Sequence, residues 1–211
     1  MIGDILFLLR EGLKITLLLA AVAIGVGTVI GSFVGWLRTV SNMFFDNVIL
    51  IFLDTIRSTP LIIQLFIAYH LPAFLGLRIS TLTAGSAVVV LYFSANTSQV
   101  VKSGIEAVDS AQWRGAKSLG FSYIQQMRHI ILPQAWRTML PSYTGFALGI
   151  IKDTSLVSVI GVTELVGAGE IVISRTLDPL PIWLTVAIIY FVICWPISKF
   201  SNKLEERVQI I

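Results

Sequence analysis

The sequence predicts an all-α integral membrane protein with about five transmembrane helices and one long polar loop between the third and the fourth. Of its 211 residues, 55% are hydrophobic and only 13% are charged, whereas an ordinary soluble domain carries roughly 25% charged residues. Its apolar stretches approach the roughly 20 residues that cross the hydrocarbon core of a bilayer. The net charge of +3 is too small to indicate a nucleic-acid partner. The length and the lack of a linker predict a single domain over residues 1–211.

The five expected spans are residues 12–37, 60–76, 80–101, 136–162 and 182–200. The apolar stretch 43–56 is too short to cross a bilayer, since a span needs about 20 residues. Because it contains Asp46 and Asp54, we expect a short helix near the inner membrane surface. Pro60 follows a Ser-Thr pair and predicts a new helix start, because proline is tolerated at the first helical position.

Positive charges are distributed unequally between the two sides of this topology. If the loop at residues 102–137 is cytoplasmic, eleven Lys and Arg residues lie inside and four lie outside. The inner ones are Arg38, Arg57, Lys102, Arg114, Lys117, Arg128, Arg137, Lys152, Lys199, Lys203 and Arg207, and the outer ones are Arg10, Lys14, Arg78 and Arg175. Cytoplasmic loops carry the excess of Lys and Arg. We therefore expect the N-terminus outside and the C-terminus in the cytoplasm.

Small and polar residues inside the spans predict where helices meet. Gly27, Gly31 and Gly35 recur every four residues, and glycines on one face let a second helix backbone approach closely. The polar run Asn96–Gln99 should face other helices or a cavity, because burying polar groups in lipid is costly. Gln64 could either bond a neighbouring helix or face water.

Lys152 and Asp153 are the sharpest charges inside a predicted span. A charge at the bilayer centre costs at least about 2.5–3.5 kcal/mol on insertion scales. Adjacent helical residues do not face each other, so a direct pair between the two is poor geometry. One hypothesis is that Asp153, with Thr154 and Ser155, lines a transport route and attracts an ammonium group. The alternative is structural: Asp153 caps a helix restart, while Lys152 reaches toward the inner surface.

Several kinds of chemistry lack their sequence signatures. No glycine-rich phosphate loop with a following Lys-Ser/Thr is present. His70 and His129 lie far apart and without the spacing of a zinc site, so we expect no metal site. No Gly-x-Ser-x-Gly motif is present either, and Cys194 is the only cysteine. We therefore expect no catalytic residues and no enzyme acting alone.

The polar loop, about residues 104–133, predicts a compact knob on the inner face. A helical stretch leads to Gly120, and glycine accepts the left-handed conformation at a helix end. A second short helix is expected from Ser122 to Ile131, followed by Leu132-Pro133 and the fourth span. A protein that lives in lipid needs a reason to hold so polar a segment, and docking of a soluble partner is that reason.

The loop resembles the "EAA" loop of permease subunits in ATP-binding-cassette (ABC) importers. The family pattern is E-A-A, three residues, G, nine residues, I-x-L-P. The matching residues here are Ala116, Gly120, Ile130, Leu132 and Pro133. Three further stretches are typical of the polar amino-acid permeases: RSTPLIIQLF from Arg57, ILPQA from Ile130 and KDTSLVSVIG from Lys152. The resemblance extends over nearly the whole chain.

The resemblance implies a permease that forms the route for a polar amino acid in a prokaryotic inner membrane. Gln64, Asn96, Asp153, Thr154 and Ser155 are then candidates for that route. The implied partners are cytoplasmic ATPase subunits, a second permease that is identical or different, and an external solute-binding protein. ATP and Mg would be held by the ATPase, and no cofactor is expected in this chain. ATP binding would close the ATPases and rock the spans through the loop.

The implied ATPase-coupling residues are Arg114, Gly115, Ala116, Lys117 and Gly120. Arg114 and Gly115 depart from the family pattern, which has Glu-Ala at these positions. The family glutamate helps to fix the loop against the ATPase, so the charge reversal leaves three alternatives. The ATPase could supply an acidic residue, or Glu106 or Asp109 could replace the missing carboxylate.

Two other functions compete with the importer permease. A stand-alone secondary carrier or channel would need no loop for an ATPase, so transport without an ATPase would favour it. A membrane scaffold without a transport role is the third alternative. The polar residues inside the third and fourth spans argue against a scaffold.

Overall fold

The computed structural model describes residues 2–209, and every regular element within them is a helix. The elements are α1 (Ile2–Phe7), the π-helical turn η1 (Leu8–Gly12), α2 (Leu13–Val40), α3 (Met43–Ser58), α4 (Leu61–Phe74), α5 (Thr81–Glu106), α6 (Ser110–Ser118), α7 (Tyr123–Gln126), the π-helical turn η2 (Met127–Ile131), α8 (Leu132–Asp153), the 3-10 helix η3 (Thr154–Ile160), α9 (Leu165–Thr176) and α10 (Pro179–Gln209).

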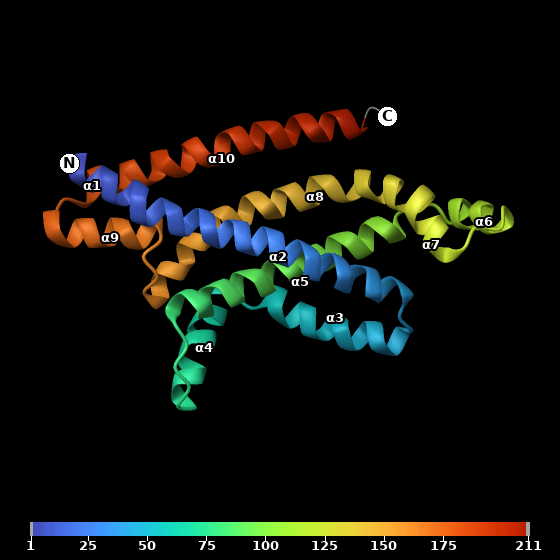
Figure 1. The fold of residues 1–211 in the computed structure, drawn as a ribbon, viewed down its shortest axis with the longest axis horizontal. Helices are drawn as coiled ribbons and strands as arrows, with labels where there is room; N and C mark the ends of the chain where they lie inside the picture. Colours follow the sequence, from blue (N-terminus) through green and yellow to red (C-terminus); the bar gives the residue numbers. More distant parts are fainter. Residues whose placement is uncertain (1, 210–211) are drawn as a thin grey trace.

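The long helices α2, α5, α8 and α10 run lengthwise through the molecule, and α5 packs against both α2 and α8 (Figure 1). Helices α6 and α7 lie at one end, whereas α1 and α9 lie at the other. Helix α10 starts beside α9 and runs toward the end that carries α6 and α7. The first and the last helix therefore finish at opposite ends of the bundle. The in-and-out orientation of the two termini stays a prediction.

The glycine face of α2 is confirmed as a close-packing face. A methyl group added at Gly31 would lie 2.6 Å from the carbonyl oxygen of Ser94, and one at Gly35 would lie 2.6 Å from that of Ser98. Both carbonyls belong to α5, so the two backbones touch with no side chain between them. The core beside this contact contains Leu19, Ala23 and Phe93.

The predicted number of spans is not confirmed. Three helical stretches are long and apolar enough to cross a membrane, 3–40, 123–160 and 179–206, and a bent pair could add a fourth. Helix α5 is long enough at 26 residues, but its apolar content is lowered by polar residues that face the bundle interior. A helix shielded by its neighbours does not need a lipid-like surface, which is why α5 can have the length of a span without its composition.

The span predicted at residues 60–76 is not a straight crossing helix. Helix α4 has only 14 residues, about 21 Å at 1.5 Å per residue, against a hydrocarbon core of about 30 Å. It bends away from α3 by 101°, and Pro60 lies at the break, as expected. The bundle is instead lined on this side by α3, which packs against α2 and α5.

The second helix of the polar loop does not end at Leu132-Pro133. Helix α7, η2, α8 and η3 form one helical run from residue 123 to residue 160. The backbone N–H of Leu132 bonds back five residues to Met127, in the π-helical pattern. Because this turn already displaces the regular hydrogen bonds, Pro133 fits into the following turn without breaking the helix.

Candidate functional site

Helix α8 presents a polar face that no other helix within residues 2–209 covers. Thr138, Ser142, Gly145, Gly149 and Lys152 follow the spacing of one helix face. All are exposed except Gly149, which is partly exposed, and a methyl group added at either glycine would meet open space. An open face with a lysine is costly in lipid. This face must therefore meet water or another protein chain.

Asp153, Thr154 and Ser155 lie where α8 passes into η3, one residue beyond that face. The Asp153 side chain is half-buried and forms no capping hydrogen bond with η3, so the structural alternative of a helix cap finds no support here. Thr154 is fully buried, and its hydroxyl donates to the carbonyl of Ile151 at 2.7 Å. Ser155 is half-buried. Asp153 and Ser155 therefore each keep a side-chain polar group that forms no hydrogen bond with the described residues.

The two other predicted route residues lie elsewhere. The Gln64 amide donates to the carbonyls of Ile56 at 2.7 Å and Thr59 at 2.8 Å. The Gln64 amide thus supplies hydrogen bonds to free carbonyl groups at the end of α3, across the sharp break. Of the two alternatives for Gln64, the bond to a neighbouring helix is the one observed. Asn96 is 7% exposed, and its amide donates to the carbonyl of Tyr92 at 2.8 Å. Both amide groups are thus engaged in hydrogen bonds to backbone carbonyls close to them in the sequence.

The polar run of α5 faces other helices, as expected. Thr97 and Ser98 are buried against the glycine face of α2, and their hydroxyl oxygens have no hydrogen-bond partner among the described residues. Gln99 lies further toward the polar loop, where its amide oxygen accepts from Arg38 at 3.2 Å. The run therefore belongs to the α2–α5 contact rather than to the open face of α8.

An ion cluster joins the loop-side ends of three helices. Arg38 of α2 donates to the Asp46 carboxylate of α3 at 2.8 Å, and Lys102 of α5 pairs with the other oxygen of the same carboxylate. Glu106 lies 3.6 Å from the Lys102 ammonium. The side chain of Arg38 is only 2% exposed. These charges are neutralised within the cluster, which explains how α3 can carry Asp46 and still pack into the bundle.

A second polar contact inside the bundle was not predicted. The hydroxyl groups of Thr28 and Tyr143 lie 2.7 Å apart and connect α2 with α8. Thr138, Ser142 and Lys152 were also missed as parts of one face. Their spacing of four and then ten residues could have revealed that face, because a recurrence on one helix face is the same signal that identified the glycines of α2.

Glu164 is a fully buried carboxyl group at the start of α9, at the bundle end opposite the polar loop. One carboxylate oxygen accepts from the backbone N–H groups of Val166 at 2.8 Å and Gly167 at 2.9 Å. The other accepts from Thr16 at 3.3 Å and Tyr190 at 3.2 Å. Burial raises the pKa of Glu164, and these four donors oppose the rise. This carboxyl group therefore fastens α9 to α2 and α10.

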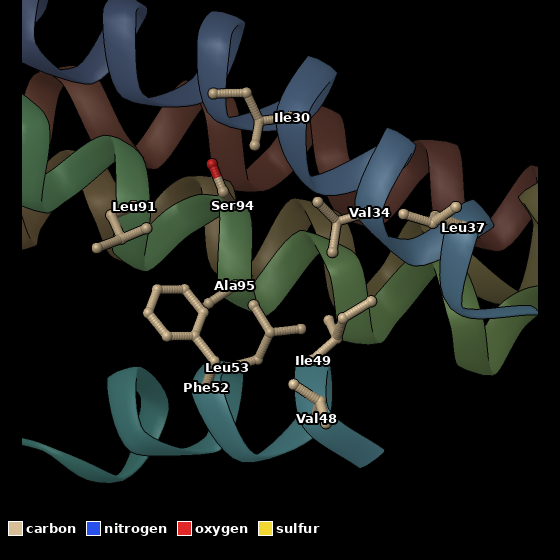
Figure 2. A pocket seen from close by; sticks show the side chains of 10 residues that line it. All are labelled: Ile30, Val34, Leu37, Val48, Ile49, Phe52, Leu53, Leu91, Ser94 and Ala95. Atoms are coloured by element: carbon tan, nitrogen blue, oxygen red, sulfur yellow. The ribbon is translucent and has the colours of Figure 1, made fainter. Parts of the chain in front are cut away.

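A cavity of about 510 Å³ lies between α2, α3 and α5 (Figure 2). It is lined by Ile30, Val34, Leu37, Val48, Ile49, Phe52, Leu53, Leu91, Ser94 and Ala95. Its single side-chain hydroxyl, that of Ser94, already donates to the carbonyl of Val90. This cavity suits an apolar occupant and not a polar solute. In the described part of the chain, no three metal-ligating side chains come close enough to hold a metal ion.

The expected knob is present at the loop end of the bundle (Figure 1). Helix α6 ends as predicted: Gly120 has φ of 80°, its N–H bonds to the carbonyl of Lys117, and the N–H of Phe121 bonds to that of Ala116. This pair of bonds is the Schellman arrangement that satisfies a helix end. Ala116 is buried, whereas Arg114, Gly115, Lys117 and Gly120 are exposed.

Helix α7 begins with a capping box. The N–H of Gln125 donates to the Ser122 hydroxyl, and the N–H of Ser122 donates to the Gln125 amide oxygen at 2.8 Å. The turn after α6 and helix α7 each expose a large apolar side chain: Leu119 of the turn is 75% exposed and Ile124 of α7 is 73% exposed. Exposed apolar groups on a polar knob are typical of a protein-binding surface.

Comparison with known proteins places these features in a family. Residues 27–210 match the family described as binding-protein-dependent transport system inner membrane component. The glutamine transport system permease protein GlnP of Escherichia coli K12 is 35% identical over 206 residues, which cover 97% of this chain and 94% of that protein. The probable amino-acid ABC transporter permease protein YckA of Bacillus subtilis is 34% identical, over 93% of this chain and 87% of that protein.

Solved structures show the same fold. An amino acid ABC transporter crystallised with histidines has a TM-score of 0.87 at 31% identity, over 95% of this chain and 94% of that chain. A chain of the MetNI methionine ABC transporter has a TM-score of 0.80 at 19% identity, over 95% and 96% of the two chains, and so supports the fold alone. The expected all-α fold and the resemblance to importer permeases are confirmed. The chain belongs to the family of inner membrane components of binding-protein-dependent transport systems.

Proposed function

We propose that this chain is the permease subunit of an ATP-driven importer and forms the route for a polar amino acid across the inner membrane. An external solute-binding protein delivers the amino acid, and cytoplasmic ATPases that hold ATP and Mg drive its passage. A second permease, identical or different, completes the route. The names of the relatives support an amino-acid substrate, and that of GlnP points to glutamine.

The open polar face of α8 carries this proposal. A span that holds Thr138, Ser142 and Lys152 on an uncovered face is unstable against lipid. A second permease placed across this face shields it and leaves polar side chains along the line of contact. A transport route between two permeases both shields this face from lipid and uses its polar side chains. A stand-alone channel within one chain would need a polar interior, but the space between α2 and α5 is filled by close packing.

Asp153 supplies the charge that this route offers to an amino acid. Its carboxyl group is half-buried, at the end of the face away from the knob, and is not engaged in capping η3. A carboxylate attracts the ammonium group that every amino acid carries. Lys152, its neighbour on the open face, would meet the substrate carboxylate. Gln64 and Asn96 hold structural hydrogen bonds and contribute to the route through the shape of the bundle.

The test is uptake of radiolabelled glutamine into proteoliposomes that contain the permeases, the cognate ATPase and the solute-binding protein. Asp153→Ala should raise the apparent KM or lower the rate by about tenfold, which corresponds to the loss of about 1.4 kcal/mol of binding. Asp178→Ala removes an exposed carboxylate outside the helices and is the matched control. The protein level in the membrane must be equal for all variants.

Two results would contradict the proposal at different points. If Asp153→Ala takes up glutamine at the wild-type rate and apparent affinity, Asp153 does not bind the substrate, but the proposal of an importer permease is unaffected. Uptake by the purified chain without any ATPase means that the protein is a secondary carrier or a channel.

A further inference from the structure

We infer that the cytoplasmic ATPase presents a carboxylate side chain to Arg114, so that the docking contact has the charge order opposite to that of an EAA loop with glutamate. This inference rests on the proposed function, because it concerns the partner of the same knob. It follows from the surroundings of Arg114, where the two acidic candidates of this chain, Glu106 and Asp109, each have another partner.

Glu106 and Asp109 were the two internal candidates for the missing carboxylate. Glu106 lines the same groove as Arg114 but lies 3.6 Å from the Lys102 ammonium, with which it pairs. Asp109 caps α6, since one of its carboxylate oxygens accepts from the N–H of Ala111 at 2.7 Å. Neither forms an ion pair with Arg114 within residues 2–209. Arg114 therefore has no carboxylate partner among the described residues, and a docking protein can supply one.

Arg114 has donors left for such a partner. One terminal nitrogen donates to the Ser110 hydroxyl at 2.8 Å, which holds the side chain along α6. A guanidinium group has five N–H donors in a planar fork, so most of them remain available. Lys117 lies three residues further on the same helix and is also exposed. This side of α6 is thus a cationic edge.

A groove lies beside Arg114 and offers a partner protein a recess to fill. Its volume is about 430 Å³, and one wall is formed by the rings of Trp113 and Tyr123, which stack at 6.1 Å between centroids. Leu119 and Ile124 are exposed around the tip of the knob. Docking a protein there removes water from around Arg114, and desolvated arginine–carboxylate pairs are strong and often bidentate. We therefore expect the ATPase surface that binds the knob to be an apolar hollow with a carboxylate at its rim.

An anionic lipid headgroup is the competing source of negative charge. A headgroup would not cover the exposed apolar side chains of Leu119 and Ile124. The segment with α6 and α7 lies at the end of the bundle (Figure 1). The apolar tip and the cationic edge together favour a protein surface, and the role of lipid can be measured in the same experiment.

The experiment measures binding of the cognate ATPase to the full-length permease in nanodiscs, with and without anionic lipid, over a series of salt concentrations. Arg114→Glu should weaken the complex by about tenfold or more, because a like charge then faces the partner carboxylate. Arg114→Lys keeps the charge without the fork and should weaken it less. Lys203→Glu makes the same change of charge at an exposed position of α10 and is the matched control.

A rescue variant makes the inference specific. Each acidic residue of the ATPase hollow is changed to Arg, and one such change should restore both binding and ATP-driven uptake with Arg114→Glu. The inference is overturned if Arg114→Glu binds the ATPase as wild type does, if no reversed carboxylate rescues it, or if its defect disappears when anionic lipid is left out. If the wild-type permease binds no ATPase at all, the proposed function fails instead.

Discussion

Gly31 is the position where one added methyl group tests the packing of α2 on α5. In Gly31→Ala the new Cβ would lie 2.6 Å from both the Ser94 carbonyl oxygen and the Thr97 Cβ. Neither atom is the end of a flexible side chain, so the two helices must move apart. Overpacking of this kind costs about 1–3 kcal/mol, and separating the backbones also weakens the neighbouring contacts at Gly27 and Gly35.

Gly25→Ala is the matched control on the same helix, because nothing lies within 4 Å of a Cβ at that position. Both substitutions gain the same helix propensity, about 1 kcal/mol. The difference between the two variants therefore isolates the clash. For a chain of this length, 1 kcal/mol corresponds to roughly 2–4 °C in Tm, so Gly31→Ala should melt roughly 2–12 °C below Gly25→Ala.

The assay is thermal unfolding of the purified permease in one detergent, followed by loss of the monodisperse peak in size-exclusion chromatography. Equal melting temperatures of the two alanine variants would refute the close backbone contact. Gly31→Ala combined with Gly35→Ala should cost less than the sum of the two single changes, since the first substitution already separates the helices.

Two further predictions concern charged groups. Asp46→Asn leaves the buried Arg38 without its carboxylate and should destabilise the protein by about 3 kcal/mol in the same assay. Asp54→Asn, whose pair with Arg57 is more exposed, should cost less than about 1 kcal/mol, and equal losses of stability would contradict the cluster. Burial raises the pKa of Glu164, so its protonated form favours folding, and this contribution is lost as the pH rises through the folded-state pKa. Between about pH 5 and about pH 8, the Tm of the wild type should fall by more than the Tm of Glu164→Gln. Parallel curves of Tm against pH for the two proteins would contradict this prediction.

The sequence predicted most of the elements but not how they meet. The glycines of α2 and the polar run of α5 were each recognised from local spacing. In the structure the two stretches face each other, and the carbonyls of Ser94 and Ser98 lie against the glycines. This contact joins residues more than 60 positions apart in the sequence. No local pattern contains that information.

The placement of α3 shows what a charge in the sequence cannot reveal. Asp46 suggested a surface helix because an unpaired carboxylate is costly in a bundle. Its partners, Arg38 and Lys102, come from two other helices, and the second is 56 residues away in the sequence. At Arg114 the limitation is of another kind: the sequence revealed the charge reversal, and the structure then showed that Glu106 and Asp109 are engaged elsewhere.

Helix α5 has a mechanical consequence, since it is unbroken from Thr81 to Glu106. Its 26 residues make a rod of about 39 Å. At one end Lys102 and Glu106 adjoin the knob, and near the other end Gly85 contacts Val157 of η3, close to Asp153. A tilt of only about 5° about one end of a rod of this length displaces the other end by about 3 Å. A small rotation of the knob can thus become a movement as large as a hydrogen bond where an amino acid would pass.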